Sequence, residues 1–282
     1  MTTHEDLAQE ARELAAQLLL DSRIVGMLGL RREGEHVHPH LFTTPDSLEA
    51  LVLEPRHLLA PICRTVLRSG STDTIGVVVR GCDERALIEM SKMEQIDMDR
   101  LVLIGLACSE SQTRQCNCAR PYPRQVDIGS KVDGVMLSDN DRVQRLLALN
   151  LEERWAFWQQ EFARCIKCYG CRNACPVCLC DECALEPPPL SPAEARVGEW
   201  VEPGQIPPPL QFHLIRLYHV VDRCVNCGAC EEACPMGIPL SVLCTVFQEQ
   251  IKELFDYEPG LDVMQQSPLT TTLEEVPFVS ND

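Results

Sequence analysis

The chain has 282 residues, 45% of them hydrophobic and 24% charged, which is the composition of an ordinary folded protein with room for two domains. Its formal net charge of -17 argues against nucleic acid as a partner, because a phosphate backbone is bound through clustered lysine and arginine. The acidic N-terminus does not resemble a signal peptide, and no apolar run is long enough to predict a transmembrane segment. We therefore expect a cytoplasmic protein, and we leave open its association with the inner face of a membrane-bound complex.

The first forty residues predict a helix and then an edge strand. Apolar residues recur at helical spacing from Leu7 to Leu18, as expected for a helix that packs on a core or a subunit interface. His36, His38 and His40 alternate in "EHVHPH" and would share one face of a strand. Pro39 interrupts this segment, which favours a solvated edge strand over a metal site.

A strand, a helix and a second strand are predicted between residues 75 and 106. Ile75 to Val79 is a short apolar run typical of a strand buried on both faces, and Gly81 ends it. Asp83 can cap the following helix, and residues 101–106 form the second strand. Because strands joined by a helical crossover run parallel, we predict an α/β domain with a small parallel sheet.

Four cysteines are expected to meet at one edge of this sheet. Cys82 and Cys108 follow the two strands, so both should emerge where open α/β sheets place ligands, and the loop "RQCNCARPYP" brings two more within reach. These candidate ligands of a metal cluster, called the rim cysteines below, are Cys82, Cys108, Cys116 and Cys118. The alternative is that some are buried apolar residues with one reactive thiol among them.

The densest cysteine pattern, C-x2-C-x2-C-x3-C-P, occurs twice. In two-cluster ferredoxins the first three cysteines of each motif hold one [4Fe-4S] cluster, and the fourth holds the other. We therefore predict two [4Fe-4S] clusters with crossed ligands. Quartet 1 is Cys165, Cys168, Cys171 and Cys234, and quartet 2 is Cys175, Cys224, Cys227 and Cys230. The rim cysteines would then hold a third cluster.

Zinc is the alternative metal for these motifs. A zinc site uses paired C-x2-C knuckles and has no need of a third evenly spaced cysteine or a following proline, so iron is favoured. Three more thiols, the cysteine triplet, follow the first motif: Cys178, Cys180 and Cys183. They are candidate additional metal ligands without an identifiable fourth partner, and one of them could replace an assigned fourth ligand.

The remaining sequence completes the predicted domain organisation. A proline-rich insert separates the two motifs, and the helix "QFHLIRLYHVVDRC" follows it and delivers Cys224. A later amphipathic helix places Cys244 on its apolar face, so we expect a buried residue there; Cys63 is also expected to lie in a core. We predict an α/β domain over residues 1–140, an α-rich dicluster ferredoxin-like domain with the proline-rich insert over 141–260, and an acidic polar tail over 261–282.

Several segments resemble a known family. "GVVVRGCDERALIEM", "LVLIGLACSE" and "VDIGSKVDG" resemble the beta subunits of coenzyme F-420 hydrogenases and formate dehydrogenases, and "RCIKCYGCRNACPVCLC" and "GACEEACPMGIPL" resemble the dicluster 4Fe-4S part found in some members. The resemblance implies an iron–sulfur electron-transfer subunit, rather than the catalytic chain, of a multi-subunit oxidoreductase. Its partners would be other redox subunits: a formate dehydrogenase, a hydrogenase or a heterodisulphide-reductase-like flavoprotein.

Two points qualify this resemblance. Family enzymes that reduce a deazaflavin carry a flavin in the α/β domain, but this chain has no G-x-G-x-x-G turn for a pyrophosphate, so FAD binding stays open. The alternatives to an electron relay are thus a flavin oxidoreductase acting on a deazaflavin or nicotinamide coenzyme, and a zinc-stabilised docking protein. No catalytic acid, base or nucleophile is predicted, and an electron relay requires none.

Overall fold

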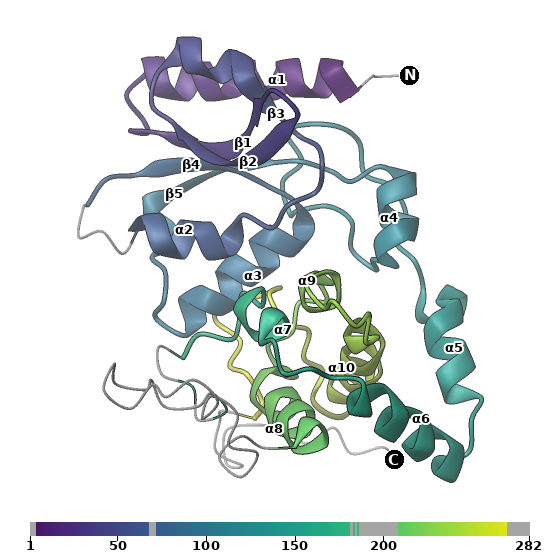
Figure 1. The fold of residues 1–282 in the computed structure, drawn as a ribbon. Helices are drawn as coiled ribbons and strands as arrows, with labels where there is room; N and C mark the ends of the chain where they lie inside the picture. Colours follow the sequence, from purple (N-terminus) through teal and green to yellow (C-terminus); the bar gives the residue numbers. More distant parts are fainter. Residues whose placement is uncertain (1–3, 68–71, 181–182, 184, 186–207, 270–282) are drawn as a thin grey trace, which may run out of the picture.

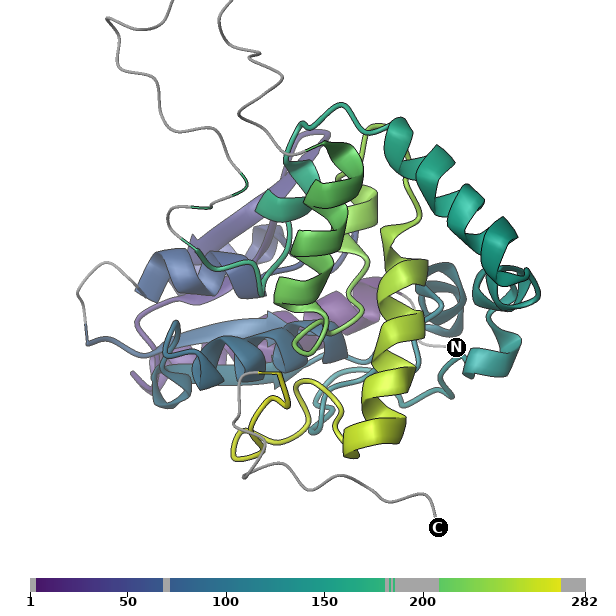
Figure 2. The same cartoon turned by 90° about the horizontal axis from the view of Figure 1, so that it is seen from below.

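The computed structural model describes residues 4–67, 72–180, 183, 185 and 208–269. An α/β region built on one sheet is followed by a helical region (Figure 1). Helix α1 (His4–Leu20) covers one face of the sheet, and α2 (Ala60–Leu67) and α3 (Gly81–Lys92) cover the other. The helical region packs on the side that carries α2 and α3, and it lies in front of the sheet in Figure 2. The predicted fold class is confirmed.

The sheet is mixed, and the predicted parallel unit forms part of it. Its strands are β1 (Met27–Glu33), β2 (His36–Phe42), β3 (Leu51–Val52), β4 (Ile75–Val79) and β5 (Leu101–Gly105). Their order is β2-β1-β4-β5, with β3 also paired to β1. Strands β1, β4 and β5 run parallel, whereas β2 and β3 are antiparallel to β1. The crossover between β4 and β5 through α3 is the predicted strand–helix–strand unit, and the histidine strand β2 lies at the edge as expected.

The helical region surrounds a core of its own. Its helices are α5 (Asp141–Leu147), α6 (Leu151–Ala163), α7 (Gly170–Asn173), α8 (Pro209–Val220), α9 (Ala229–Glu232) and α10 (Leu240–Phe255), whereas α4 (Glu110–Cys116) follows β5 in the α/β region. The described residues also form 3-10 helices: η1 (Pro45–Ala50) and η2 (Met98–Arg100) in the α/β region, and η3 (Leu137–Asp139) before α5. Phe162, Phe212 and Ile238 are fully buried among these elements. Cys244 is buried in the same core, and Cys63 is buried beneath the sheet, both as expected. No described helix is both long and apolar enough to cross a bilayer.

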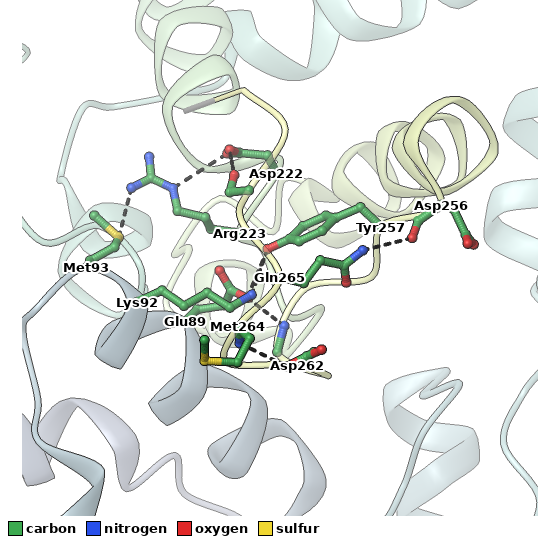
Figure 3. Close-up of polar contacts among 12 residues, drawn as sticks. Glu89, Lys92, Met93, Asp222, Arg223, Asp256, Tyr257, Asp262, Met264 and Gln265 are labelled. Atoms are coloured by element: carbon green, nitrogen blue, oxygen red, sulfur yellow. Dashed lines mark hydrogen bonds and ion pairs between the residues drawn. The ribbon is translucent and has the colours of Figure 1, made fainter. Parts of the chain in front are cut away.

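A buried polar cluster joins the two regions (Figure 3). Glu89 of α3 is fully buried, and one of its carboxylate oxygens accepts hydrogen bonds from Lys92 Nζ at 2.7 Å, Tyr257 Oη at 3.1 Å and the Gly260 amide at 2.6 Å. Tyr257 and Gly260 follow α10, so the chain folds back over α3 after its last helix. Gly260 has a φ of +75°, and a Cβ there would lie 2.4 Å from Cβ of Arg85. This close contact requires glycine.

A second set of contacts fastens the end of the described chain. Arg223, just after α8, pairs with Asp222 and donates to Sδ of Met93 in the α/β region (Figure 3). Asp222 also accepts a hydrogen bond from the buried hydroxyl of Ser267. The predicted tail is therefore attached to the body of the protein at the buried Ser267, while Asp262, Val263 and Met264 are exposed, and residues 270–282 fall outside the described part.

Replacing Glu89 should loosen the contact between the two regions. In Glu89→Ala, the Lys92 ammonium, the Tyr257 hydroxyl and the Gly260 amide lose their shared acceptor, and we expect the free energy of unfolding to fall by about 3 kcal/mol. Anaerobic urea unfolding of the full chain measures this. Glu10→Ala, at an exposed position of α1, is the control and should change it by less than about 0.5 kcal/mol. A similar small change for both variants would contradict the assignment.

Candidate functional site

The structure brings each cysteine quartet together around its own hollow. Hollow 1 is lined by all four members of quartet 1, and hollow 2 by all four members of quartet 2. The fourth cysteine of each motif, Cys175 or Cys234, therefore crosses to the hollow of the other motif. Among the described residues, no three Cys, His, Asp or Glu side chains converge as they would around a single metal ion. The thiols of each quartet surround a small hollow and do not converge on the position of one ion.

The two motif loops repeat one backbone conformation. Lys167 and Asn226, which occupy the same motif position, have φ values of +54° and +52°. Tyr169 and Gly228 likewise share the left-handed region, at +57° and +78°, and each starts the short helix that carries the third cysteine. These turns curl the chain so that amide groups point back at the first cysteine: Lys167 donates to Sγ of Cys165 at 3.4 Å. Amide donors of this kind favour sulfur that carries negative charge.

Close contact between the two loops depends on Gly170 at the start of α7. A Cβ on this residue would lie 2.7 Å from the carbonyl oxygen of Ala233 and 3.5 Å from Sγ of Cys168. Ala233 immediately precedes Cys234, the crossing ligand of quartet 1. The absence of a side chain at position 170 therefore sets how near the crossing cysteine comes to hollow 1.

The two hollows differ in depth. Burial raises the pKa of Cys175, Cys227 and Cys230 in quartet 2, and a hydrogen bond with Cys244, together with burial, raises that of Cys224 well above its ordinary value. In quartet 1, burial raises the pKa of Cys165 and Cys171, while Cys168 is exposed. Thiolates are disfavoured in both hollows without nearby positive charge, and bound iron would supply it.

Two buried polar side chains of α8, His213 and Arg216, line the hollows and have nitrogen atoms without a hydrogen-bond partner among the described residues. His213 lines hollow 1, and neither of its ring nitrogens has a hydrogen-bond partner. Burial, with the nearby Arg216, lowers its pKa to about 4. Arg216 lines hollow 2, donates from Nη2 to the Cys171 carbonyl at 2.9 Å, and leaves its buried Nε without an acceptor. Unsatisfied buried donors are costly, and the sulfur atoms of an iron–sulfur cluster are acceptors, so both hollows fit such a group.

The rim cysteines meet at the carboxyl edge of the sheet. Cys82 begins α3, Cys108 follows β5, Cys116 ends α4, and Cys118 follows the left-handed Asn117. Cys118 lies close enough to the other three thiols to influence their pKa values. Burial raises the pKa of Cys82 to about 12 and that of Cys108 to about 11. The structure thus gathers all four thiols where the topology predicts.

Glycine at the ends of β4 and β5 allows the rim loop to approach. A Cβ at Gly105 would lie 1.9 Å from the Gln125 carbonyl oxygen, and one at Gly81 would lie 2.4 Å from that of Tyr122. The Cys108 amide also donates to the Pro121 carbonyl at 2.8 Å. These contacts hold residues 120–125 against the strand ends and place the C-x-C pair beside Cys82 and Cys108.

Arg56 connects the rim cysteines to quartet 2. It donates to the Cys227 carbonyl at 3.0 Å and pairs with the carboxylate of Glu232. Burial alone would lower its pKa, but the neighbouring Cys82 and Cys116 thiols and Glu232 raise it. Cys82 and Cys227 also influence each other directly. Quartet 2 therefore lies beside the rim cysteines, and Arg216, which lines hollow 2 and binds the Cys171 carbonyl, connects it to quartet 1.

The cysteine triplet is not drawn into the hollows. Cys178 lies near Cys175 and Cys183, and burial raises its pKa to about 11. Cys178 and the exposed Cys180 line a separate cavity beside α2, together with Cys175. The loop is fixed there by backbone carbonyls, since Leu179 and Cys180 accept hydrogen bonds from Arg64 and Arg172. The structure does not show a fourth ligand for the triplet among the described residues.

The charged and polar neighbours of the thiols were not predicted from the sequence. They are His213 and Arg216, on the helix that leads to the second motif, and Arg56, which is far from both motifs in the chain. Cys244, expected only in the core, also forms a hydrogen bond with Cys224 and lines hollow 2. One pattern could have revealed two of them. His213 and Arg216 share the buried face of α8 with Phe212 and Leu217, and a charged residue on an apolar helix face requires a partner.

Comparisons with known proteins found similarity to a domain family and to curated proteins. Residues 161–238 match the 4Fe-4S dicluster domain family, which supports iron–sulfur clusters as the cofactors of this region. The chain is 38% identical over 147 residues to the F420-dependent formate dehydrogenase subunit beta of Methanocaldococcus jannaschii, a match that covers 51% of the chain and 35% of that protein. It is also 38% identical over 146 residues to the F420-dependent formate dehydrogenase 1 subunit beta of Methanococcus maripaludis, covering 50% of the chain and 34% of that protein.

The resemblance expected from the sequence motifs is therefore confirmed. The chain spans only about a third of the length of these two curated relatives.

Adding a methyl group at Gly170 should disturb hollow 1. We expect Gly170→Ala to lower the iron and acid-labile sulfide bound per chain, because its Cβ would push the Ala233 backbone, and with it Cys234, away. Anaerobic metal analysis measures this. Gly34→Ala is the control: it places alanine at a φ of +61° in open space, so it costs backbone strain of about 1 kcal/mol without touching a cysteine. Equal iron loss in both variants would attribute the effect to general instability.

Proposed function

We propose that the chain is an iron–sulfur electron-transfer subunit of a multi-subunit oxidoreductase. Quartet 1 and quartet 2 would each hold one [4Fe-4S] cluster. The observation that carries the proposal is the crossing of Cys175 and Cys234 into two adjoining hollows, within the segment that matches the dicluster domain. Such clusters supply one-electron carriage, and neighbouring clusters suit a relay.

The protein itself would hold the clusters, shield them from solvent and orient hydrogen-bond donors towards them. The motif loops present three thiols from one side of each hollow and the crossing cysteine from the other. Arg216 and His213 offer donors from α8, which would favour electron density on cluster sulfur. Cys168 and its neighbour Ile166, which is 62% exposed, place hollow 1 nearest to solvent. We propose that a redox partner exchanges electrons at this end.

The rim cysteines are proposed to hold a third [4Fe-4S] cluster. Support comes from their meeting at the sheet edge, the proximity of Cys118 to the other three thiols, and the two arginines, Arg56 and Arg80, that lie near them. This cluster would extend the relay beyond hollow 2 into the α/β domain. The cysteine triplet is retained as a candidate for further metal ligation beside Cys175.

The identity of the complex is proposed from the relatives. Both are named as beta subunits of F420-dependent formate dehydrogenase, so we propose other redox subunits as partners, with a formate dehydrogenase first among them. The alternative, a subunit that itself carries FAD and exchanges hydride with a deazaflavin or nicotinamide, has no specific support in the described residues. Flavin analysis is therefore part of the first experiment.

Anaerobically purified full chain should contain iron and acid-labile sulfide and little zinc. Two clusters correspond to about eight iron ions per chain and three to about twelve. Reduction should produce low-temperature paramagnetic resonance signals. Stoichiometric zinc without sulfide would instead support the docking protein, and stoichiometric FAD with coenzyme turnover would support the flavin oxidoreductase.

The third cluster is tested by one substitution in the same analysis. Cys118→Ser should lose about four iron ions, because this thiol is the common neighbour of the other rim cysteines. Cys63→Ala removes a thiol that is fully buried in the apolar core, and it should keep the wild-type iron content. An unchanged content in Cys118→Ser would restrict the clusters to the two quartets.

The relay itself is tested in the native complex. A tagged chain isolated anaerobically from its host should bring a second redox protein with it, and formate should bleach the visible absorption of the iron–sulfur chromophores. Cys168→Ser, at the solvent-exposed end of the relay, should slow this bleaching because it alters the proposed entry cluster. If a redox protein is co-isolated but formate does not reduce the chromophores, another electron donor is indicated. If the complex oxidises formate rapidly without reducing the clusters of this chain, the relay is contradicted.

A further inference from the structure

Helix α8 reaches both hollows from one face. His213 and Arg216 are one helical turn apart, and the first lines hollow 1 whereas the second lines hollow 2. Both side chains are buried, at 3% and 4% exposure. The helix therefore offers an imidazole to one hollow and a guanidinium to the other.

Arg216 is an unusual buried cation. Its neighbours are the thiols of Cys175, Cys230, Cys171 and Cys244, and no ion pair to a carboxylate is found for it within the described residues. Its one described hydrogen bond goes to the Cys171 carbonyl, and its Nε is left without an acceptor. A buried guanidinium is always charged and is expensive to bury unpaired. An anionic cluster in hollow 2 would provide the missing counter-charge.

Two other cations near the quartets, Arg56 and Lys167, are compensated or partly exposed to water. Arg56 donates to the Cys227 carbonyl and is already paired with Glu232. Lys167 lies at hollow 1 but is only partly buried, so solvent screens its charge. Arg216 is thus the one cation among these three that is deeply buried and has no described carboxylate partner. Its effect should be largest in hollow 2, which its side chain lines.

We propose that Arg216 raises the reduction potential of the cluster held by quartet 2 above that of the cluster held by quartet 1. The first electron added to the protein would then reduce the quartet 2 cluster. Reduction adds one negative charge, and a nearby buried cation that also donates a hydrogen bond stabilises the reduced form. This inference rests on the proposed function, because it requires clusters in both hollows. In this role Arg216 determines which cluster is reduced first and does not itself bind iron.

The experiment is an anaerobic potentiometric titration followed by paramagnetic resonance. In the wild-type chain, the quartet 2 cluster should be reduced first. Cys168→Ser identifies the signals, since it should alter only those of the quartet 1 cluster. A wild-type protein in which the quartet 1 cluster is reduced first would overturn the inference.

Substitutions at position 216 separate charge from packing. In Arg216→Gln, the ratio of reduced quartet 2 cluster to reduced quartet 1 cluster should fall by about tenfold or more, which is about 59 mV for a one-electron couple. Arg216→Lys should keep most of the wild-type difference between the two reduction potentials. His213→Phe is the matched control on the same helix face, and it should leave the quartet 2 potential nearly unchanged. Equal shifts of both clusters in Arg216→Gln, or no shift, would also overturn the inference.

The outcomes distinguish this inference from the proposed function. If Arg216→Gln fails to retain iron, the order of reduction in the wild-type chain and the behaviour of Arg216→Lys decide the question. Iron-replete protein with the opposite order rejects the role of Arg216 and leaves the electron-transfer subunit intact. Wild-type protein without iron and sulfide rejects both.

Discussion

Eight cysteine thiols packed into two adjoining hollows must become thiolates to bind iron, and the cost of that negative charge governs this structure. Burial raises the pKa of most of these thiols, so the apoprotein resists forming the charges that the cofactor needs. Bound iron would offset this penalty. Amide donors in the motif loops, the guanidinium of Arg216 and the ring of His213 are the protein's own contribution. The arrangement of α8 follows from this requirement.

Helix α3, which connects β4 to β5, also joins the two regions of the protein. At its start, α3 carries Cys82 among the rim cysteines, and near its end it carries Glu89, which binds the segment after α10. Arg56 adds a contact from the loop before α2 to the second motif. The α/β region is therefore fixed at both ends of α3, and this keeps the rim cysteines beside hollow 2.

The sequence predicted the features that depend on local periodicity or on a motif. The strand–helix–strand unit follows from Ile75–Val79 and its partner strand, and the cysteine spacing alone predicts the crossed quartets. The histidine edge strand β2 was predicted, but its antiparallel hairpin with β1, which makes the sheet mixed, was not, because β1 itself was not recognised as a strand. The pairing of β3 with β1 was also not predicted, since it joins segments further apart in the chain. His213, Arg216 and Arg56 were missed because the sequence does not show which side chains of α8, or of the loop before α2, lie against the cysteine quartets. Each acquires its role only when α8 or the loop before α2 reaches a hollow.

The two motif loops repeat the same pair of left-handed turns, but not with the same residues. Glycine occupies the second turn position in one half, but Tyr169 occupies it in the other and pays for the strained backbone with contacts of its own. Its hydroxyl donates to the Leu185 carbonyl at 3.0 Å, and its ring packs edge-on against Phe212. These bonds tether the first half to residues on both sides of the proline-rich insert. The two halves are therefore not interchangeable: Tyr169 holds Leu185 and Phe212 in place, whereas Gly228, at the matching position, has no side chain that could do so.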